Sequence, residues 1–319
     1  AARVAAGLRA AGLPIGATVA LMLPTGADYF FGFFGILKAG GIPVPIYPPA
    51  RPEQLEDHLL RHAGILANAG AVFLITVPAA RIAARLLKAR VASLRAVLTP
   101  EQFADGGAAP MPRSRDPDAI AMLQYTSGST GAPKGVILSH ADLLANIRAM
   151  GEAVEVRPGD CFVSWLPLYH DMGLIGAWLG SLYFGTPLVS MSPLAFLARP
   201  IRWLQAIHEH RGTLSAAPNF AYELCLSRIQ DADLEGLDLS CWRRAFNGAE
   251  PVSASTLERF AARFGPWGLH KDALAPVYGL AEAAVGLSFP PPERGPRIDC
   301  IDRQRLAAEG QALPVPCDD

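Results

Sequence analysis

The stretch QYTSGSTGAPKGVILSH, residues 124–140, differs sharply from the rest of this 319-residue chain and decides its fold. Four hydroxyl residues and three glycines lie within ten positions, 126–135, and Lys134 follows Pro133. Elsewhere the chain is rich in alanine, leucine and arginine, and it contains only four lysines. The stretch therefore brings together accessible backbone, hydroxyl groups and one mobile positive charge.

The residues around the loop predict a buried strand at 119–125 and a helix at 141–153, with the loop leading from one to the other. Ser139 is expected to cap the helix, with Asp142 three residues later in capping-box position. Backbone N–H groups at a helix start bind phosphate, and a glycine lets the backbone approach a ligand closely. A flexible Gly/Ser linker is the alternative, and it fits poorly between a buried strand and a capped helix.

The loop does not follow the Walker A pattern, because Lys134 is preceded by Pro133 and followed by Gly135. It is therefore interpreted as a phosphate-binding loop of another kind. Its predicted members are Thr126, Ser127, Gly128, Ser129, Thr130, Gly131, Lys134 and Gly135.

Outside the loop, short apolar runs alternate with helical patterns along the whole chain. Runs at 18–23, 42–47, 71–77 and 95–99 are expected as strands before the loop, with further strands after it. Such alternation is typical of βαβ units and mostly parallel sheets. The prediction is an α/β fold with two or more mixed or parallel sheets flanked by helices, and with approximate lobes at 1–110 and 119–319.

Composition excludes several classes of function. A net charge of −1 argues against a nucleic-acid-binding protein and against a polybasic membrane anchor. The apolar run at 29–47 is interrupted by Lys38, a glycine pair and prolines, so no integral membrane segment is expected. The five cysteines show no C-x-x-C spacing, and their odd number predicts neither a disulfide framework nor a zinc site. A reduced, cytoplasmic setting is expected.

Four motifs together resemble one family. YTSGSTGAPKG, residues 125–135, resembles the signature of the adenylate-forming (AMP-binding) enzymes. LPLYHDMGLIG at 166–176 is similar to the acyl-pocket motif of that family, FNGAEPV at 246–252 to its adenine-pocket segment, and YGLAE at 278–282 to its adenine-and-magnesium motif. The resemblance covers nearly the whole chain. It implies the large N-terminal domain of this fold over residues 1–319, truncated at both ends, without the small C-terminal domain that carries a catalytic lysine.

The resemblance implies ATP and Mg²⁺ as cofactors and assigns the catalytic roles. A carboxylate would attack the α-phosphorus of ATP, while Lys134 and the loop hold the β- and γ-phosphates. Glu282 would bind Mg²⁺, which takes one or two carboxylates besides phosphate oxygens. His170 would control the approach of the carboxylate. A solvated surface glutamate and a structurally hydrogen-bonded histidine are the competing interpretations.

The same resemblance implies an adenine site and an acyl pocket. Tyr278 would stack on adenine, although an ordinary core tyrosine is possible, and Asn247 could instead cap a turn. Ala281 and Ala283 stand where acyl-CoA synthetases often have threonines. The expected adenine-site residues are Asn247, Gly248, Ala249, Glu250, Tyr278, Gly279, Leu280 and Ala281. The expected acyl-pocket residues are Met172, Trp178, Phe184, Phe220 and Tyr222, each of which could also be a core residue.

Within the family, the chain is most like the fatty acyl-AMP ligases. SWLPLYHDMGLIG and PNFAYELC resemble their motifs, and residues 287–319 resemble the insertion that directs the acyl group to the phosphopantetheine of an acyl carrier protein, or of a polyketide or peptide synthase. The predicted function is ATP-dependent activation of a fatty acid for that transfer, with poor activity of this fragment alone. The alternatives are a fatty acyl-CoA synthetase, an amino-acid adenylation domain, and a catalytically incomplete nucleotide- or lipid-binding module.

Overall fold

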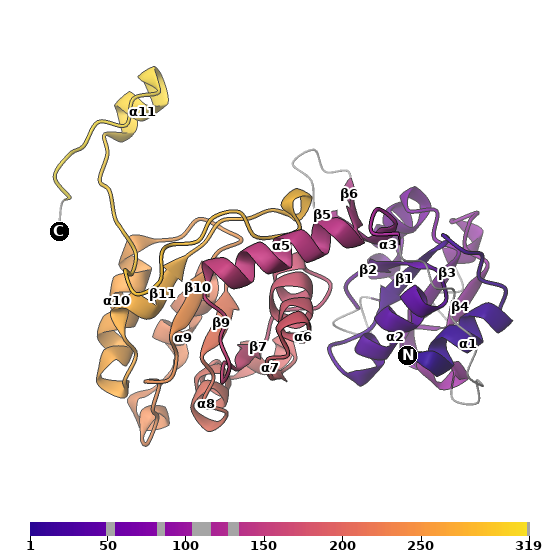
Figure 1. Cartoon of the computed structure of the whole chain (residues 1–319), viewed down its shortest axis with the longest axis horizontal. Helices are drawn as coiled ribbons and strands as arrows, with labels where there is room; N and C mark the ends of the chain where they lie inside the picture. The colour runs from indigo at the N-terminus through magenta and orange to yellow at the C-terminus, as the bar shows by residue number, and fades with distance from the viewer. Residues whose placement is uncertain (49–54, 82–86, 104–115, 127–133, 318–319) are drawn as a thin grey trace.

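A computed structural model describes residues 1–48, 55–81, 87–103, 116–126 and 134–317 (Figure 1). The first sheet has four parallel strands in the order β2-β1-β3-β4. Nearly every residue of β1 is buried, as a strand covered on both faces requires. The strands are β1 (Thr18–Met22), β2 (Ile42–Pro45), β3 (Phe73–Thr76) and β4 (Ala96–Leu98). The helices of this lobe are α1 (Ala2–Ala10), α2 (Ala27–Lys38) and α3 (Leu55–Asn68).

The second sheet has five parallel strands in the order β11-β10-β9-β7-β8. The expectation of an α/β fold with parallel sheets is confirmed. The strands are β7 (Phe162–Ser164), β8 (Leu188–Ser190), β9 (Leu214–Ala217), β10 (Arg244–Asn247) and β11 (Leu274–Pro276). The helices are η5, a π-helix (Met172–Leu179), α6 (Gly180–Phe184), α7 (Pro193–Ala198), α8 (Ile201–Glu209), α9 (Asn219–Arg228) and α10 (Ala254–Phe264).

A β-hairpin and a long helix join the two lobes. Strand β5 (Ile120–Thr126) pairs antiparallel with β6 (Lys134–Ser139), and α5 (His140–Ala153) follows β6 directly. In Figure 1, α5 reaches from the hairpin across the second sheet. The expectation that the loop after residue 126 leads directly into a helix was wrong. Residues 134–139 form β6 and pair with β5, so a strand stands between the loop and the helix.

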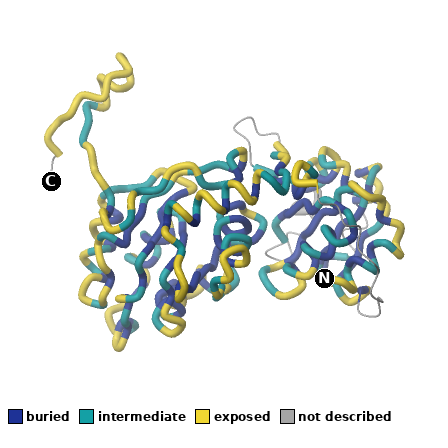
Figure 2. The backbone as a smooth tube through the Cα atoms, viewed as in Figure 1, coloured by how far each residue is buried: buried dark blue, intermediate teal, exposed yellow. Residues whose placement is uncertain are grey.

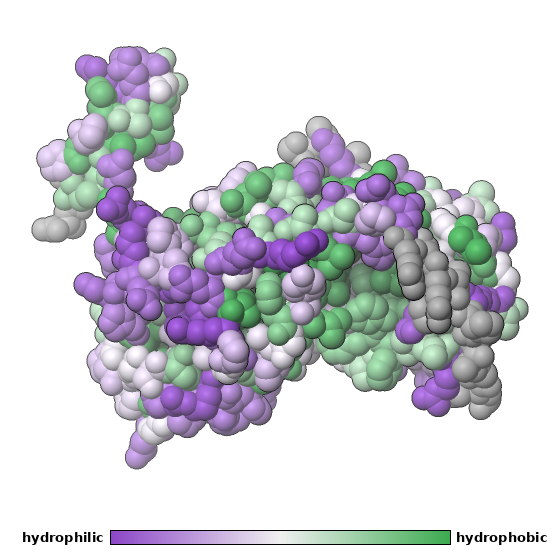
Figure 3. Space-filling model, viewed as in Figure 1, coloured by the Kyte–Doolittle hydropathy of each residue, from purple (hydrophilic) through white to green (hydrophobic). Residues whose placement is uncertain are grey.

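Burial follows the two sheets. Figure 2 shows dark, buried strands inside each lobe and an exposed segment that leaves the body at the C-terminal end. On the face shown in Figure 3, hydrophobic residues gather beneath α5 and between the lobes. One core cluster combines α2 and strands of the first sheet with residues of α5 and the π-helix. The core thus continues from the first lobe onto the helices that border the second sheet.

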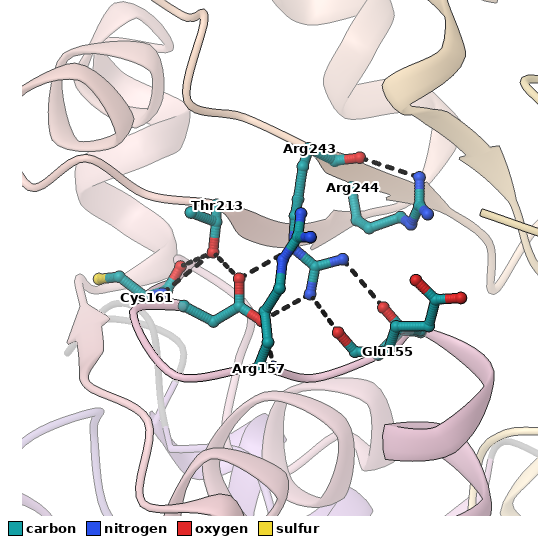
Figure 4. A network of polar contacts seen from close by, with 8 residues as sticks. Glu155, Arg157, Cys161, Thr213, Arg243 and Arg244 are labelled. Carbon is teal, nitrogen blue, oxygen red and sulfur yellow. Dashed lines mark hydrogen bonds and ion pairs between the residues drawn. The ribbon is translucent and has the colours of Figure 1, made fainter. Parts of the chain in front are cut away.

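An ion-pair network ties the C-terminal end of α5 to the second sheet (Figure 4). Arg243 lies just before β10, and its Nε and Nη2 donate to the Asp160 carboxylate at 2.8 and 2.5 Å. Its Nη1 and Nη2 also donate to the carbonyls of Val154 and Glu155, each at 2.9 Å. The Thr213 hydroxyl donates to Asp160 Oδ1 at 2.7 Å. Five donor–acceptor pairs therefore join three segments that are far apart in the sequence.

The C-terminal segment stands away from the body. It contains α11 (Arg303–Glu309), which buries no residue, and it projects outward in Figures 1 and 2. Cys300 and Cys317 form a disulfide across it, with their Cα atoms 5.3 Å apart. The expectation of no disulfide was therefore wrong. An odd number of cysteines leaves at least one unpaired but does not forbid a single pair, and the segment folds back so that Ile301 bridges Pro314.

Among the described residues, none of the helices combines the length and apolar character needed to traverse a lipid bilayer.

Candidate functional site

A cavity of about 360 Å³ lies beneath α5, and it is lined by segments from most of the second lobe. Its acidic and imidazole groups, Asp171, Glu282 and His170, come from the start of the π-helix and from the 3₁₀ turn η9 (Ala281–Ala283). Hydroxyl groups come from Thr126 at the end of β5 and from Tyr278, Ser181 and Thr186. Its apolar wall comes from α5, α6 and the strands below, and includes Ile147, Met150, Val154, Phe162, Phe184, Leu214, Phe246, Val285 and Phe289.

The cavity is long because one helical segment runs along it. His170 and Asp171 lie at the N-terminal end of η5, and Phe184 is the last residue of α6, which continues η5. At the α-helical rise of 1.5 Å per residue, residues 171–184 extend roughly 15–20 Å. Gly176 and Gly180 line the cavity between these ends, and a Cβ at Gly176 would meet no atom within 4 Å. The absent side chains therefore leave open space that an elongated ligand can occupy.

His170 and Asp171 form an ion pair at the polar end of the cavity. His170 Nδ1 lies 2.8 Å from Asp171 Oδ1, and the hydrogen bond to Asp171 raises the pKa of His170 against the opposing effect of burial. The same carboxylate oxygen accepts from the Met172 N–H at 2.7 Å. Asp171 thus both begins the π-helix and favours a positively charged imidazole that lines the cavity.

Residues 278–288 form a compact turn over the cavity. Tyr278 bridges Ser288, and the tyrosine side chain is 64% exposed. A Cβ at Gly279 would lie 1.6 Å from the Val285 carbonyl oxygen, so only glycine fits there. Glu282 sits at the tip of this turn and lines the cavity. No group of three or more His, Cys, Asp or Glu side chains that could hold a metal ion comes together in the described part of the chain.

Asn146 holds this turn against α5, and the sequence analysis missed it. Its Nδ2 donates to the Gly286 carbonyl at 2.7 Å, and its Oδ1 accepts from the Gly286 N–H at 3.0 Å. Asparagine has a low helix propensity, so its presence inside a helix is the sequence signal that could have identified this residue.

The adenine-site predictions divide into two groups. Ala249, Tyr278, Gly279, Leu280 and Ala281 line the cavity. Asn247 is fully buried and donates to Asn219 Oδ1 at 3.1 Å, while Glu250 accepts from the Phe220 N–H at 2.5 Å. Gly248 packs against Val277 and does not line the cavity. Asn247, Gly248 and Glu250 therefore contact residues next to the cavity but do not line it.

The acyl-pocket predictions also divide. Met172 and Phe184 line the cavity, whereas Trp178, Phe220 and Tyr222 do not. Trp178 is buried against the aromatic rings of α2, with Phe33 at 5.3 Å. The Tyr222 hydroxyl donates to the buried Phe246 carbonyl at 2.8 Å, and Phe220 is 43% exposed near Trp165. The wall instead uses α5 residues that none of the recognised motifs contains, such as Ile147 and Met150.

The structure describes only three of the residues predicted for the phosphate loop, namely Thr126, Lys134 and Gly135. Thr126 lines the cavity, and Lys134, directly opposite it in the hairpin, is exposed at the start of β6. Gly135 packs against the Tyr125 ring, where a Cβ would lie 2.9 Å from Cζ. Ser127, Gly128, Ser129, Thr130 and Gly131 lie outside the described residues.

Comparison with known proteins places this geometry in context. The profile of a family described as AMP-binding enzyme matches residues 1–314. Long-chain-fatty-acid–AMP ligase FadD32 of Mycolicibacterium smegmatis is 38% identical over 312 residues, which are 95% of this chain and 49% of that protein. Medium-chain-fatty-acid–[acyl-carrier-protein] ligase JamA of Moorena producens is 40% identical over 84% of this chain and 46% of its own length. The chain spans about half the length of the curated relatives it matches.

Solved structures of fatty acyl-adenylate ligases are also similar to this chain. One from a study of fatty acyl-adenylate ligases of E. coli and L. pneumophila has a TM-score of 0.93 at 37% identity, covering 99% of this chain and 58% of that one. The L. pneumophila fatty acyl-adenylate ligase in complex with acyl adenylate and pyrophosphate has a TM-score of 0.86 at 34% identity, over 98% and 54% of the two chains.

Proposed function

Because this chain belongs to the AMP-binding enzyme family, we propose that the protein carrying it activates a fatty acid with ATP, forming acyl-adenylate and pyrophosphate. The observation that carries the proposal is the long cavity, whose acidic and imidazole groups lie at the start of η5 and in η9. Toward the end of α6 its wall is mainly apolar, with two hydroxyl groups from Ser181 and Thr186. A fatty acid has the same distribution of polarity. The relatives named as fatty-acid–AMP ligases support the same chemistry.

The reaction requires positioning rather than covalent catalysis. A carboxylate oxygen attacks the α-phosphorus of ATP, the bond to the β-phosphate oxygen breaks, and pyrophosphate leaves. His170, whose pKa is raised by Asp171, contacts the incoming carboxylate and offsets its charge near the phosphate. Lys134 and the hairpin tip hold the β- and γ-phosphates.

The nucleotide is proposed to lie against residues 278–281. Tyr278 stacks on the adenine ring, and its exposure before the ligand arrives is consistent with that role. Gly279, Leu280, Ala281 and Ala249 line the same region, while Asn247, Gly248 and Glu250 act from behind it.

Glu282 fits a magnesium ligand. Its carboxylate lines the cavity, where the other acidic side chain, Asp171, is paired with His170. One available carboxylate suits an ion that binds mainly phosphate oxygens and water. When bound, Mg²⁺ would neutralise charge on the triphosphate.

We propose that the acyl group then passes to the phosphopantetheine thiol of an acyl carrier protein, or of a polyketide or peptide synthase. The relative JamA is named for such an acceptor. The segment from residue 287 onward, interpreted as the ligase-specific insertion, ends in a projection that stands clear of the body and is available to other domains or partners. Because the reaction consumes ATP, we place it in the cytoplasm.

The test uses the full-length protein with ATP, Mg²⁺ and a fatty acid. Fatty-acid-dependent exchange between ATP and pyrophosphate is expected, with acyl-adenylate accumulating when CoA is the only thiol and acyl transfer to a carrier protein bearing phosphopantetheine. Lys134→Ala should reduce exchange by about a hundredfold, the effect of removing one charge-stabilising donor. Lys271→Ala, an exposed lysine that does not line the cavity, is the matched control.

Three results would contradict the proposal in different ways. Rapid formation of acyl-CoA would favour the acyl-CoA synthetase. Exchange with amino acids alone would favour an amino-acid adenylation domain. Nucleotide binding without exchange would favour a catalytically incomplete binding module.

A further inference from the structure

The apolar end of the cavity is separated from an outer groove by only a few side chains. The groove has a volume of about 750 Å³ and is formed by residues 156–161, by 184–187 and by His210 and Arg211. Three residues line both the cavity and the groove, namely Val156, Phe184 and Thr186. These residues therefore form the wall between the two spaces.

Phe184 is the largest and least constrained of the three. It is the last residue of α6, because Gly185 takes a left-handed conformation with φ of 67° and ends the helix. No further helical turn packs over its ring, and the side chain is 37% exposed. The neighbouring ring within the same helix is Tyr183, at 5.0 Å between centroids. Rotation of Phe184 outward is therefore opposed by few contacts.

The ring rests on a glycine in the facing helix. A Cβ at Gly151 of α5 would lie 2.0 Å from Phe184 Cζ and 2.9 Å or less from both Cε atoms. Gly151 is buried and also lines the cavity. The Phe184 ring thus occupies the space that the side chain of any residue larger than glycine would need at position 151. Phe184 therefore closes the cavity against a glycine, which offers no side chain to hold its ring in place.

We propose that Phe184 is a displaceable end wall that sets the longest acyl chain the closed cavity accepts, and that longer chains push its ring aside and extend into the outer groove. This inference rests on the proposed function, since it assumes that the cavity holds an acyl chain. Up to the wall, each further methylene is fully buried and should improve affinity by about fourfold. Beyond it the chain enters an open groove that also carries Arg157, Asp160 and His210, so the gain per methylene should fall.

The test compares chain-length profiles in the full-length protein. For saturated acids from octanoate to stearate, kcat/KM for ATP–pyrophosphate exchange is measured alongside the Kd of the matching acyl sulfamoyl-adenosines. Phe184→Ala is expected to move the optimum to longer chains and to raise the stearate-to-octanoate ratio by tenfold or more. Phe184→Trp is expected to move it toward shorter chains. Leu182→Ala, which removes an exposed side chain of the same helix that lines neither space, should leave the profile unchanged.

Gly151→Ala provides an independent variant. Its methyl group would overlap the Phe184 ring, and alanine favours the helix more than glycine does, so the fold should be retained. The displaced ring should shift the profile toward longer chains, as Phe184→Ala does. Ratios of kcat/KM between two acids are compared, because a loss of folded protein lowers the apparent kcat/KM of every acid by the same factor.

The outcomes separate the two proposals. If the wild-type protein uses fatty acids but Phe184→Ala and Gly151→Ala keep its chain-length profile, the end wall lies elsewhere and this inference is overturned. If no fatty acid supports exchange or binds as its adenylate analogue, both the proposed function and this inference are contradicted.

Discussion

Asp171 serves two purposes with one oxygen atom. Its Oδ1 accepts from the Met172 N–H and lies beside His170 Nδ1, so the residue that starts the π-helix also controls the charge of the histidine before it. A carboxylate in this position holds the histidine ring in one orientation and stabilises the protonated form.

Asp171→Asn is therefore expected to lower the pKa of His170 toward its ordinary value. Because the folded-state pKa is raised, the favourable charge interaction is fully present below the ordinary pKa and is lost as pH rises through the folded value. NMR titration of the His170 ring protons measures the change. Asp272→Asn, beside the distant surface residue His270, should leave the His170 curve unaltered. A His170 curve that is identical in Asp171→Asn would show that Asp171 is not the cause.

At the scale of one element, α5 is defined by its first residues. Ser139 Oγ accepts from the Asp142 N–H at 3.1 Å, and Asp142 Oδ2 accepts from the Ser139 N–H at 2.9 Å. This capping box was predicted from sequence and is confirmed. It fixes the start of the helix immediately after β6.

Ser139→Ala should reduce the free energy of unfolding by about 1 kcal/mol, because the first-turn N–H groups lose their acceptor. Urea denaturation followed by far-UV circular dichroism measures the loss. Ser227→Ala, an exposed serine within α9 whose hydroxyl donates to the Leu224 carbonyl, is the control and should change stability little. Equal stability of Ser139→Ala and wild type would mean that the cap contributes nothing.

Local signals explain which elements could be predicted from the sequence. Helix α10 is defined by local signals, because Ser253 caps it and its apolar residues recur at helical spacing. Strand β6 was missed, since its partner β5 lies across a loop and pairing is not a local property. Trp178 is placed in the core, the alternative that the sequence left open, because it packs against the rings of α2 while Gly176 and Gly180 line the cavity.

At the scale of the molecule, stability depends on the buried pair of Asp160 and Arg243. Burial acts to raise the pKa of Asp160, but hydrogen bonds from Arg243, Arg157 and Thr213 outweigh it and lower that pKa. The carboxyl therefore stabilises the fold above its ordinary pKa, and this contribution is lost as pH falls through the lowered folded-state value.

Arg243→Met should cost about 3–5 kcal/mol in the free energy of unfolding, because it leaves a buried carboxylate unpaired. It should also move acid unfolding to higher pH, since the pKa of Asp160 would then rise. Equilibrium denaturation at several pH values gives both quantities. Arg305→Met breaks an exposed pair with Glu309 in α11, a helix that buries no residue, and should leave the acid transition where it is. Matching transitions in Arg243→Met and wild type would contradict the proposed role of the pair.

The candidate site was predictable where one motif contains the residues that meet, as in the turn at 278–282. It was not predictable where distant elements meet. Ile147 and Met150 of α5 line the cavity only because η5 and α6 pack against that helix, and no spacing in the sequence records this contact.

The clamp between Asn146 and Gly286 joins the two regions proposed for nucleotide and acyl chain through helix α5. Asn146 grips the turn proposed to hold the nucleotide, and one turn further along α5, Met150 and Gly151 form part of the wall proposed for the acyl chain. Where α5 moves as a unit, a ligand that displaces one end of the helix changes the free energy of ligand binding at the other end. The resulting coupling is reciprocal: to whatever extent an acyl chain strengthens nucleotide binding, nucleotide must strengthen acyl binding by the same factor. Chain length, set at the far wall, would then tune affinity for ATP as well as for the acid.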